Sequence, residues 1–445
     1  MIVTITLFFI LGYLAITLEH TLKIDKLIPA LLMMAASWAI IALGIDGVHH
    51  WFDTHSAHLI SIQHFTHEAK SELLHSTLLH HFGKTAEILM FLMGAMAIVE
   101  MIDHFNGFGI IQKLIRTKSK FKLLWVLSML AFVLSAIIDN LTATIVLITI
   151  LRKLVPNHTD RMWYSGFIII AANAGGAWTP IGDVTTTMLW MAGKVTTQKL
   201  ALLLGIPSLV TILIPLCIGY FLPIFKGNLT GHIEHQKNVG RYAGPMLIIG
   251  LSLIIFVPIF KTITHLPPYI GMMFSLAIFA VIAELISARM LKFTFGGTAE
   301  ETHTQGPTLK ALSKIEMPSV LFFLGILMTV AAMESLGMIY NFGQMVNATI
   351  PQHQFVTLLG VASSIVDNVP LVAASIGMFT DPTDATIWHY IAYAAGTGGS
   401  LLIIGSAAGV VAMGMEKISF IWYLKHISII GLLGYAGGII TLFIL

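Results

Sequence analysis

The sequence predicts an all-α polytopic membrane protein with about ten transmembrane spans and two re-entrant hairpins, arranged as an inverted repeat with broken helices. Hydrophobic residues make up 56% of the 445 residues and charged residues only 10%, and the mean hydropathy is +0.87. Soluble globular proteins carry about 25% charged residues. In addition, Asp-Asn stands twice inside an apolar run, in 135-SAIIDNLTATIVLITI-150 and in 363-SSIVDNVPLVAASIGM-378.

Ten apolar runs are each long enough to cross roughly 30 Å of hydrocarbon as a helix. These expected spans are residues 1–18, 27–45, 86–103, 163–191, 200–225, 243–261, 268–287, 319–341, 388–415 and 426–445. They divide the chain into two N-terminal spans with an outer loop (1–85), a first repeat (86–242), linking spans with an inner loop (243–318) and a second, inverted repeat (319–445).

Two further apolar stretches, 121–151 and 352–380, contain the Asp-Asn pairs. Basic residues gather on the cytoplasmic side of short loops. The first stretch has them on both sides: Lys113, Arg116, Lys118, Lys120, Lys122, Arg152, Lys153 and Arg161. The flanks of the second stretch, 342–354 and 380–389, contain none. Each stretch is therefore interpreted as a re-entrant hairpin, the first from inside and the second from outside, and this topology places both termini outside.

Motifs correspond between the two halves. Gly94 matches Gly325, and the string 173-NAGGAWTPIGD-183 matches 396-GTGGSLLIIGS-406. A single Gly-Gly pair would indicate close helix packing, but these pairs stand beside the two Asp-Asn hairpins. An odd number of crossings separates the two copies, so they have opposite orientations. Inverted repeats with interrupted helices are typical of secondary transporters, with the site at the repeat interface.

The segment 163–191 is expected to break near Thr179–Asp183, because Pro180 lacks a backbone N–H and the neighbouring glycines permit non-helical dihedrals. Freed carbonyls and nearby side-chain oxygens form the shell that hard cations prefer. Apart from Lys122 at the start of 121–151, no Lys or Arg lies in the four broken segments, which favours a cation over an anion. The candidate ligands are Asp139, Asn140, Asn173, Thr179, Asp183, Thr185, Thr186, Asp367 and Asn368.

The three aspartates also predict coupling to protons. An Asp at membrane depth carries an insertion penalty of about 2.5–3.5 kcal/mol. A cation and a proton compete for such a carboxylate, because either one neutralises it. Each aspartate alone also has a structural interpretation, as the N-cap of a half-helix. Asp183 stands where it can serve both roles.

Several strings together resemble the NhaD-type sodium/proton antiporters of the wider ion transporter superfamily. They are 17-TLEHTLKIDK-26, 84-KTAEILMFLMGAM-96, IIDNLTA, ANAGGAWTPIGDVTTT and SSIVDNVPL. The resemblance implies Na⁺ or Li⁺ exchanged for H⁺ across a bacterial inner membrane. It carries the family's functional positions over to the residues named above and adds Ser363 and Ser400. At the position matching Asp183 the second copy has Ser406, so the implied site is asymmetric.

Two glutamates are candidates for gating or proton access, Glu100 and Glu334. Glu334 aligns with Asp103 in the repeat, which suggests a shared role. Glu100 and Asp103 stand near the inner end of their expected helix, where long charged side chains ordinarily reach out to water. That simpler interpretation stays open for Glu100.

The outer loop 46–86 contains nine of the 19 histidines. Its later part is amphipathic and suits a helix lying on the outer membrane surface, although a solvated polar loop is the simpler interpretation. Histidine titrates near pH 6.5, so pH sensing is one hypothesis. A membrane enzyme with several His boxes would need them on different spans, and the spans offer none.

The leading hypothesis is therefore a Na⁺ (or Li⁺)/H⁺ antiporter and not an enzyme, with no cofactor and no metal other than the transported ion. The alternative is an arsenite- or dicarboxylate-type carrier of the same superfamily, which a basic site residue and missing carboxylates would favour. The expected surroundings are a lipid bilayer, with no nucleic acid. A homodimer fits the resemblance.

Overall fold

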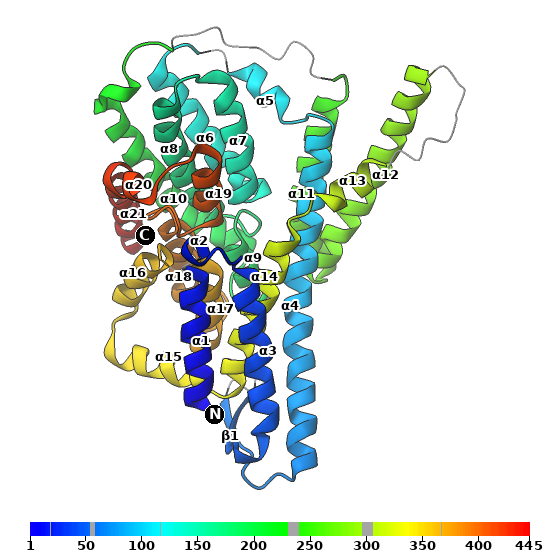
Figure 1. Cartoon of the computed structure of the whole chain (residues 1–445), viewed down its shortest axis with the longest axis vertical. Helices are drawn as coiled ribbons and strands as arrows, with labels where there is room; N and C mark the ends of the chain where they lie inside the picture. Colours follow the sequence, from blue (N-terminus) through cyan, green and yellow to red (C-terminus); the bar gives the residue numbers. More distant parts are fainter. Residues whose placement is uncertain (18, 54–57, 116, 230–239, 296–305, 366) are drawn as a thin grey trace.

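The computed structural model describes all residues except 18, 54–57, 116, 230–239, 296–305 and 366. The described chain is almost entirely helical, as Figure 1 shows. This confirms the predicted fold class of an all-α polytopic membrane protein. One of the basic residues that flank the first hairpin, Arg116, lies outside the described residues.

The first half runs from a helical hairpin through a long helix to the first broken helix. Its elements are α1 (Ile2–Thr17), α2 (Glu19–Leu22), α3 (Leu27–Leu43), η1 (Ile45–Gly47), β1 (His50–Asp53), β2 (His58–Ser61), α4 (His67–His104), α5 (Gly109–Leu114), α6 (Lys120–Ile138), α7 (Asn140–Leu154), α8 (His158–Gly176), α9 (Val184–Met191), α10 (Thr197–Phe221) and η2 (Pro223–Phe225).

The second half follows a similar order of long, re-entrant and broken helices. Its elements are α11 (Ala243–Thr264), α12 (Pro268–Phe295), α13 (Pro307–Ser313), α14 (Met317–Ser335), α15 (Met338–Thr349), α16 (Gln352–Ser363), α17 (Asn368–Met378), α18 (Thr386–Gly398), α19 (Ala407–Glu416), α20 (Phe420–His426) and α21 (Ser428–Ile444).

Among the described residues six helices are long and apolar enough to cross a membrane: α4, α6, α10, α11, α12 and α14. Five of them overlap predicted spans, whereas α6 was predicted to be only one arm of a hairpin. The predicted spans 1–18, 27–45 and 426–445 form shorter helices of 16, 17 and 17 residues. The predicted spans 163–191 and 388–415 are each two helices, because glycines and Pro180 interrupt them. The span predicted at 319–341 ends early, since Gly337 adopts a left-handed conformation (φ 68°).

The outer loop is folded, which corrects both interpretations made from the sequence. α4 is one continuous helix of 38 residues, so its amphipathic start does not lie flat on a membrane surface but extends the span. In front of it, β1 and β2 form an antiparallel hairpin in which Trp51 is buried against Ile5 and Leu336. Lys70 donates to the backbone oxygens of Asp46 (2.9 Å) and Val48 (3.0 Å). His55 lies outside the described residues.

The two predicted hairpins approach each other from opposite ends of the molecule. Figure 1 shows α6 and α7 in its upper half, with α16 and α17 lower down. The outer ends of α6 and α7 carry the basic residues Lys120, Lys122, Arg152 and Lys153. The connection before α16, at the lower end, carries no Lys or Arg. This arrangement supports the opposed hairpins predicted from charge.

Equivalent contacts recur in the two halves and support the inverted repeat. Ser135 Oγ donates to the backbone oxygen of Ala172 at 2.6 Å, and Ser363 Oγ donates to that of Ala395 at 2.8 Å. Both pairs join a re-entrant helix to a broken helix. The glycines show the same pattern: a Cβ on Gly175 would overlap the backbone of α6, and one on Gly398 would overlap the backbone of α16. These glycines let the helices meet backbone to backbone.

The correspondence extends to helices that the sequence had left outside the repeat. The turn between α1 and α3 contains left-handed Lys23 (φ 55°), and the turn after α11 contains left-handed His265 (φ 57°). A Cβ on Gly94 of α4 would meet Met272 of α12, and one on Gly325 of α14 would meet Ala30 of α3. The α1–α3 and α11–α12 hairpins therefore occupy matching places, each packed on the long helix of the other half.

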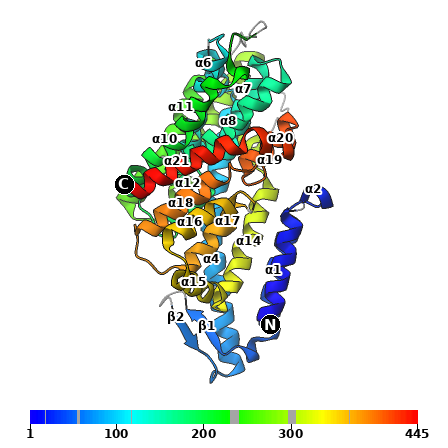
Figure 2. The ribbon, with the colours of Figure 1, turned by 90° about the vertical axis from the view of Figure 1, so that its left-hand side faces the viewer.

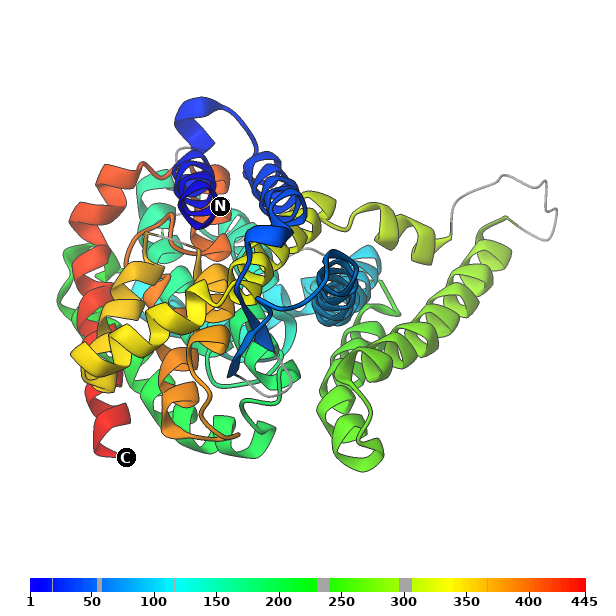
Figure 3. The ribbon, with the colours of Figure 1, turned by 90° about the horizontal axis from the view of Figure 1, so that it is seen from below.

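The helices pack as two groups. Figure 2 shows one member of the first group, α1, at the edge of the molecule. The scaffold group consists of α1, α3, α4, α11, α12 and α14, and Figure 3 shows α4 between the α11–α12 pair and the remainder. The core group consists of α6–α10 and α16–α21. Within the core group the two halves interlock: Glu416 of α19 accepts from Arg152 Nε (2.7 Å) and Arg161 Nε (2.9 Å). Exposed apolar side chains along α1, such as Val3 and Leu11, suit contact with lipid.

Candidate cation-binding site

Four helix N-termini of the core group converge near its centre, and each is capped by the side chain of the residue just before the helix. Asp139 caps α7, accepting from Thr142 N at 2.8 Å. Asp183 caps α9 through Thr185 N at 2.9 Å. The second half contributes Asp367 on α17 and Ser406 on α19. Local sequence explains this, because Asp and Ser satisfy free N–H groups at helix starts and a carboxylate offsets the positive end of the helix dipole.

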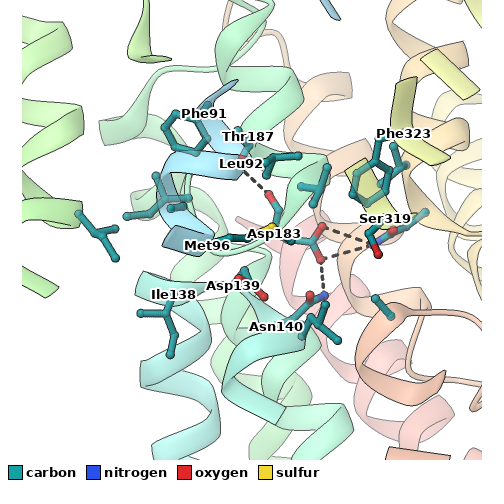
Figure 4. Close-up of a pocket in the computed structure, with 18 of the residues that line it drawn as sticks. Phe91, Leu92, Met96, Ile138, Asp139, Asn140, Asp183, Thr187, Ser319 and Phe323 are labelled. Carbon is teal, nitrogen blue, oxygen red and sulfur yellow. Dashed lines mark hydrogen bonds between the residues drawn. The ribbon is translucent and has the colours of Figure 1, made fainter. Parts of the chain in front are cut away.

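A buried hydrogen-bond network joins these helix starts, and Figure 4 shows the part of it around Asp183 and Asn140. Asn140 Nδ2 donates to Asp183 Oδ2 at 2.8 Å and to Asn173 Oδ1 at 3.0 Å. Asn173 Nδ2 donates to Ser406 Oγ at 3.0 Å, and Asn368 Nδ2 lies 3.4 Å from both carboxylate oxygens of Asp183. Asp183 is thus the common acceptor between the two Asp-Asn hairpins. The network crosses from one half of the chain to the other.

A cavity of about 60 Å³ lies between the core and scaffold groups. The core side contributes the predicted residues Asp139, Asn140, Asp183, Asp367 and Asn368. The scaffold side contributes mostly apolar side chains, labelled in Figure 4: Phe91, Leu92 and Met96 of α4, with Phe323 and Ser319 of α14. Pockets for organic ligands usually measure about 300–1,000 Å³. This cavity instead has the scale of a small ion.

The other predicted site residues do not line this cavity. Thr185 Oγ1 donates to Asp183 Oδ1 at 2.8 Å, so it orients that carboxylate from behind. Thr179 donates to the backbone oxygen of Ala136 on α6 at 2.6 Å, and Thr186 donates to that of Asp183 within the break at 2.9 Å. Ser363 and Ser400 also donate to backbone oxygens, in contacts that hold the second half together.

The structure adds a residue that sequence reasoning missed. Lys26, at the start of α3, places its Nζ 3.6 Å from Asp367 Oδ2 and 4.5 Å from the centre of the Phe322 ring. It lines the same cavity as the aspartates. The near-absence of Lys and Arg from the broken segments therefore did not make the cavity free of basic groups. Lys26 ends the string 22-LKIDK-26, which was part of the family resemblance, but only the fold brings Lys26 close to Asp367.

The two candidate gating glutamates lie away from the cavity. Glu100 of α4 pairs with Lys314 at 3.6 Å. Glu334, near the end of α14, lines a second cavity of about 360 Å³ together with His81, Lys84 and Lys194. In the part of the chain that the structure describes, no three His, Cys, Asp or Glu side chains gather closely enough to hold a metal ion.

Comparisons with known proteins place the chain in a family. The family model described as "Citrate transporter" matches residues 8–389. Sodium/proton antiporters 1 and 2 of Arabidopsis thaliana are 38% and 35% identical over 98% of this chain, covering 71% and 97% of their own lengths. The Na(+)/H(+) antiporter NhaD of Vibrio parahaemolyticus is 32% identical over 84% of this chain and 93% of its own length. The chain therefore belongs to the NhaD-type sodium/proton antiporters, within the broader group described by the citrate transporter model.

Proposed function

We propose that this chain is a secondary active transporter that exchanges Na⁺ or Li⁺ for H⁺ across a membrane, and not an enzyme. The observation that carries the proposal is the capping of three of the four convergent helix N-termini by aspartate, around an ion-sized cavity. Relatives named as sodium/proton antiporters support it. The proposed site consists of the residues predicted from the sequence, with Asp183 at its centre and Thr185, Thr186, Asn173 and Ser406 as supports.

The capped helix ends distinguish a cation site from an anion site. Free helix N-termini attract anions, because their N–H groups and dipoles point outward. Here one N–H group at each of the four helix starts is already directed at a carboxylate or hydroxyl of the chain itself. A dicarboxylate would meet three aspartates, which repel it. The alternative of a small-anion carrier, suggested by the name of the family model, is therefore disfavoured.

Exchange follows if cations and protons compete for the same carboxylates. A proton neutralises an aspartate as completely as a sodium ion does, so the site is neutralised by one or the other. The cavity lies between the scaffold and core groups, whose mutual contacts are few compared with those inside each group. We propose that the core group moves against the scaffold group, carrying the site from one side to the other. Glu100 and Glu334 are proposed to act in gating or proton access at the edges of this path.

We further propose a plasma membrane location with both termini outside, following the distribution of basic residues. Bacterial relatives support the bacterial inner membrane that the resemblance implies, while the plant relatives show that the family also occurs elsewhere.

A homodimer is proposed on the same resemblance. The repeat is proposed to include the α1–α3 and α11–α12 hairpins.

The direct test is exchange in proteoliposomes. Purified protein is reconstituted with an imposed acid-inside pH gradient, and a pH-sensitive dye reports the gradient while Na⁺, Li⁺ or K⁺ is added outside. We expect prompt, saturable loss of the gradient with Na⁺ or Li⁺. Empty liposomes and liposomes with the Asp183→Asn variant serve as controls. No response to any cation, with arsenite or dicarboxylate uptake instead, would contradict the proposal and establish the anion carrier.

A further inference from the structure

The ion pair between Lys26 and Asp367 joins the two helix groups. Lys26 precedes α3 in the scaffold group, and Asp367 caps α17 in the core group. The side chains are only 23% and 17% exposed, and the buried Phe322 ring lies against the ammonium group. Among the residues described, Lys26 is the one Lys or Arg that lines the central cavity.

Lys26 lies between two cavities. Together with Asp367 it lines the central cavity and a smaller cavity of about 50 Å³ toward α1 and α19, which contains Glu19 and Ser406. A cation that moved between these spaces would pass the ion pair. The ammonium group therefore stands at a position where a transported cation would interact with Asp367.

Of the three aspartates, Asp367 receives the weakest hydrogen bonding, so the Lys26 ammonium group is its main partner. Asp183 accepts from Thr185 at 2.9 and 2.8 Å and from Asn140 at 2.8 Å. Asp139 accepts two bonds from Thr142, at 2.8 and 2.9 Å. For Asp367 the hydrogen bond from Val369 N to Oδ1 is long at 3.4 Å, and Oδ2 faces Lys26.

The pair exists in one half of the repeat only. The matching left-handed residues Lys23 and His265 align the two scaffold hairpins, and this alignment places Pro268 at the position of Lys26. Proline carries no charge, so the corresponding tip at Asp139 has no counterpart of the ammonium group. The lysine is thus an addition to the symmetric framework and not a requirement of the fold.

Building on the proposed function, we propose that Lys26 is a built-in counter-cation that competes with the transported ion for Asp367 and so sets the affinity and selectivity of the site. Asp139, Asp183 and Asp367 line one cavity. Each negative charge left without a partner there favours a divalent cation such as Ca²⁺ over a monovalent one, because the attraction grows with the charge of the ion. With Asp367 engaged by Lys26, two carboxylates remain for a small monovalent cation. The competition also keeps binding weak enough for release, as conduction and transport require.

The test compares the Na⁺ dependence of exchange in wild type, Lys26→Gln and Lys26→Arg. A unit charge roughly 6 Å away changes ion affinity by about a hundredfold at an effective dielectric constant near 20, and solvent screening reduces this. We therefore expect K26Q to lower the KM for Na⁺ by about tenfold or more and to lower kcat, because release slows. K26R keeps the charge and should stay near wild type. Lys23→Gln, an exposed lysine in the same turn, is the matched control and should not change KM.

Two further readouts separate a charge effect from a packing effect. In K26Q, Ca²⁺ should inhibit Na⁺ exchange competitively, whereas the wild type should be insensitive at the same concentration. Asp367→Asn leaves the ammonium group unbalanced, so its KM should rise strongly. The double variant K26Q/D367N restores the net charge of the wild type, and its KM should return toward the wild-type value. Such recovery is the signature of a coupled pair.

A KM for K26Q within about twofold of wild type, without Ca²⁺ inhibition, would overturn the inference. So would a double variant that binds Na⁺ no better than D367N. If K26Q does not fold, Lys26→Met and ²²Na⁺ binding in detergent provide the same comparison. Absence of cation-dependent exchange in the wild type would instead refute the proposed function, so the two failures are distinguishable.

Discussion

Asp139 has a backbone conformation that residues with a side chain rarely adopt, with φ 76° and ψ 158°. This region of dihedral space is essentially restricted to glycine, and a non-glycine residue there costs about 1–3 kcal/mol. The chain nevertheless places a carboxylate at this tip, one peptide away from Asn140 and facing the cavity. Such strain persists where the surrounding packing over-determines it, and it is consistent with a role for the Asp139 carboxylate beyond capping α7.

The Asp139→Asn variant should abolish Na⁺-dependent exchange, because an amide has the shape of the carboxylate but neither its charge nor its proton affinity. Its folding should be retained, since Asn is also a good N-cap. Exchange in proteoliposomes and thermal melting in detergent measure the two properties. Glu68→Gln removes an exposed carboxylate at the start of α4 and is the matched control. Exchange at the wild-type rate in D139N would remove this carboxylate from the mechanism.

At the scale of elements, the breaks and hairpins were predictable because their causes are local. Proline, glycine and capping Asp act within a few residues of where they stand, so Pro180 and Asp183 mark the first break directly. Contacts between distant segments were not predictable in this way. The approach of Lys26 to Asp367, and the continuation of α4 through the outer loop, depend on packing that no short motif encodes. For the same reason the sequence did not suggest the proposed inclusion of the α1–α3 hairpin in the repeat.

The glycines at the helix crossings should be intolerant of any side chain. In Gly175→Ala the added methyl group would overlap the backbone of Phe132, and backbone cannot rotate away as a side chain can. We expect a loss of about 1–3 kcal/mol or more in stability, as for overpacked cores. Gly398→Ala should behave alike, at the matching crossing. Gly414→Ala, where nothing lies within 4 Å, should be neutral or slightly stabilising. Melting temperatures in detergent give the comparison, and equal values for all three variants would contradict it.

The clamp at Glu416 should hold the two halves of the core group together. Its side chain is fully buried and accepts from Arg152 and Arg161 of the other half. Removing one partner of a buried ion pair typically costs about 3–5 kcal/mol. Glu416→Gln should therefore lower thermal stability clearly, and more than Arg152→Gln, since the Arg152 side chain is 45% exposed. A melting temperature for E416Q equal to wild type would show that the clamp contributes little.

At the scale of the whole molecule, the arrangement makes a prediction about sidedness. The hairpins α6–α7 and α16–α17 lie toward opposite ends of the molecule in Figure 1, so the proposed topology predicts that their outer ends face different compartments. In a background with Cys217 replaced by Ser, a cysteine at His353 should react with a membrane-impermeant maleimide added to intact cells. A cysteine at Lys153 should react only after the membrane is opened. Labelling of both, or of Lys153 alone, in intact cells would contradict the topology.

The unequal halves have a consequence for the direction of transport. In an inverted repeat, the inward-open and outward-open shapes are related by exchanging the roles of the two copies. In this chain the copies differ in charge: Asp183 corresponds to Ser406, and Lys26 corresponds to Pro268. The two open shapes therefore present different electrostatic environments to the ion, although their backbones correspond. The inward-open and outward-open states should therefore bind the ion with different affinities and release it at different rates. Under equal and opposite gradients the protein should transport faster in one direction than in the other, because of the side chains at these two pairs of positions.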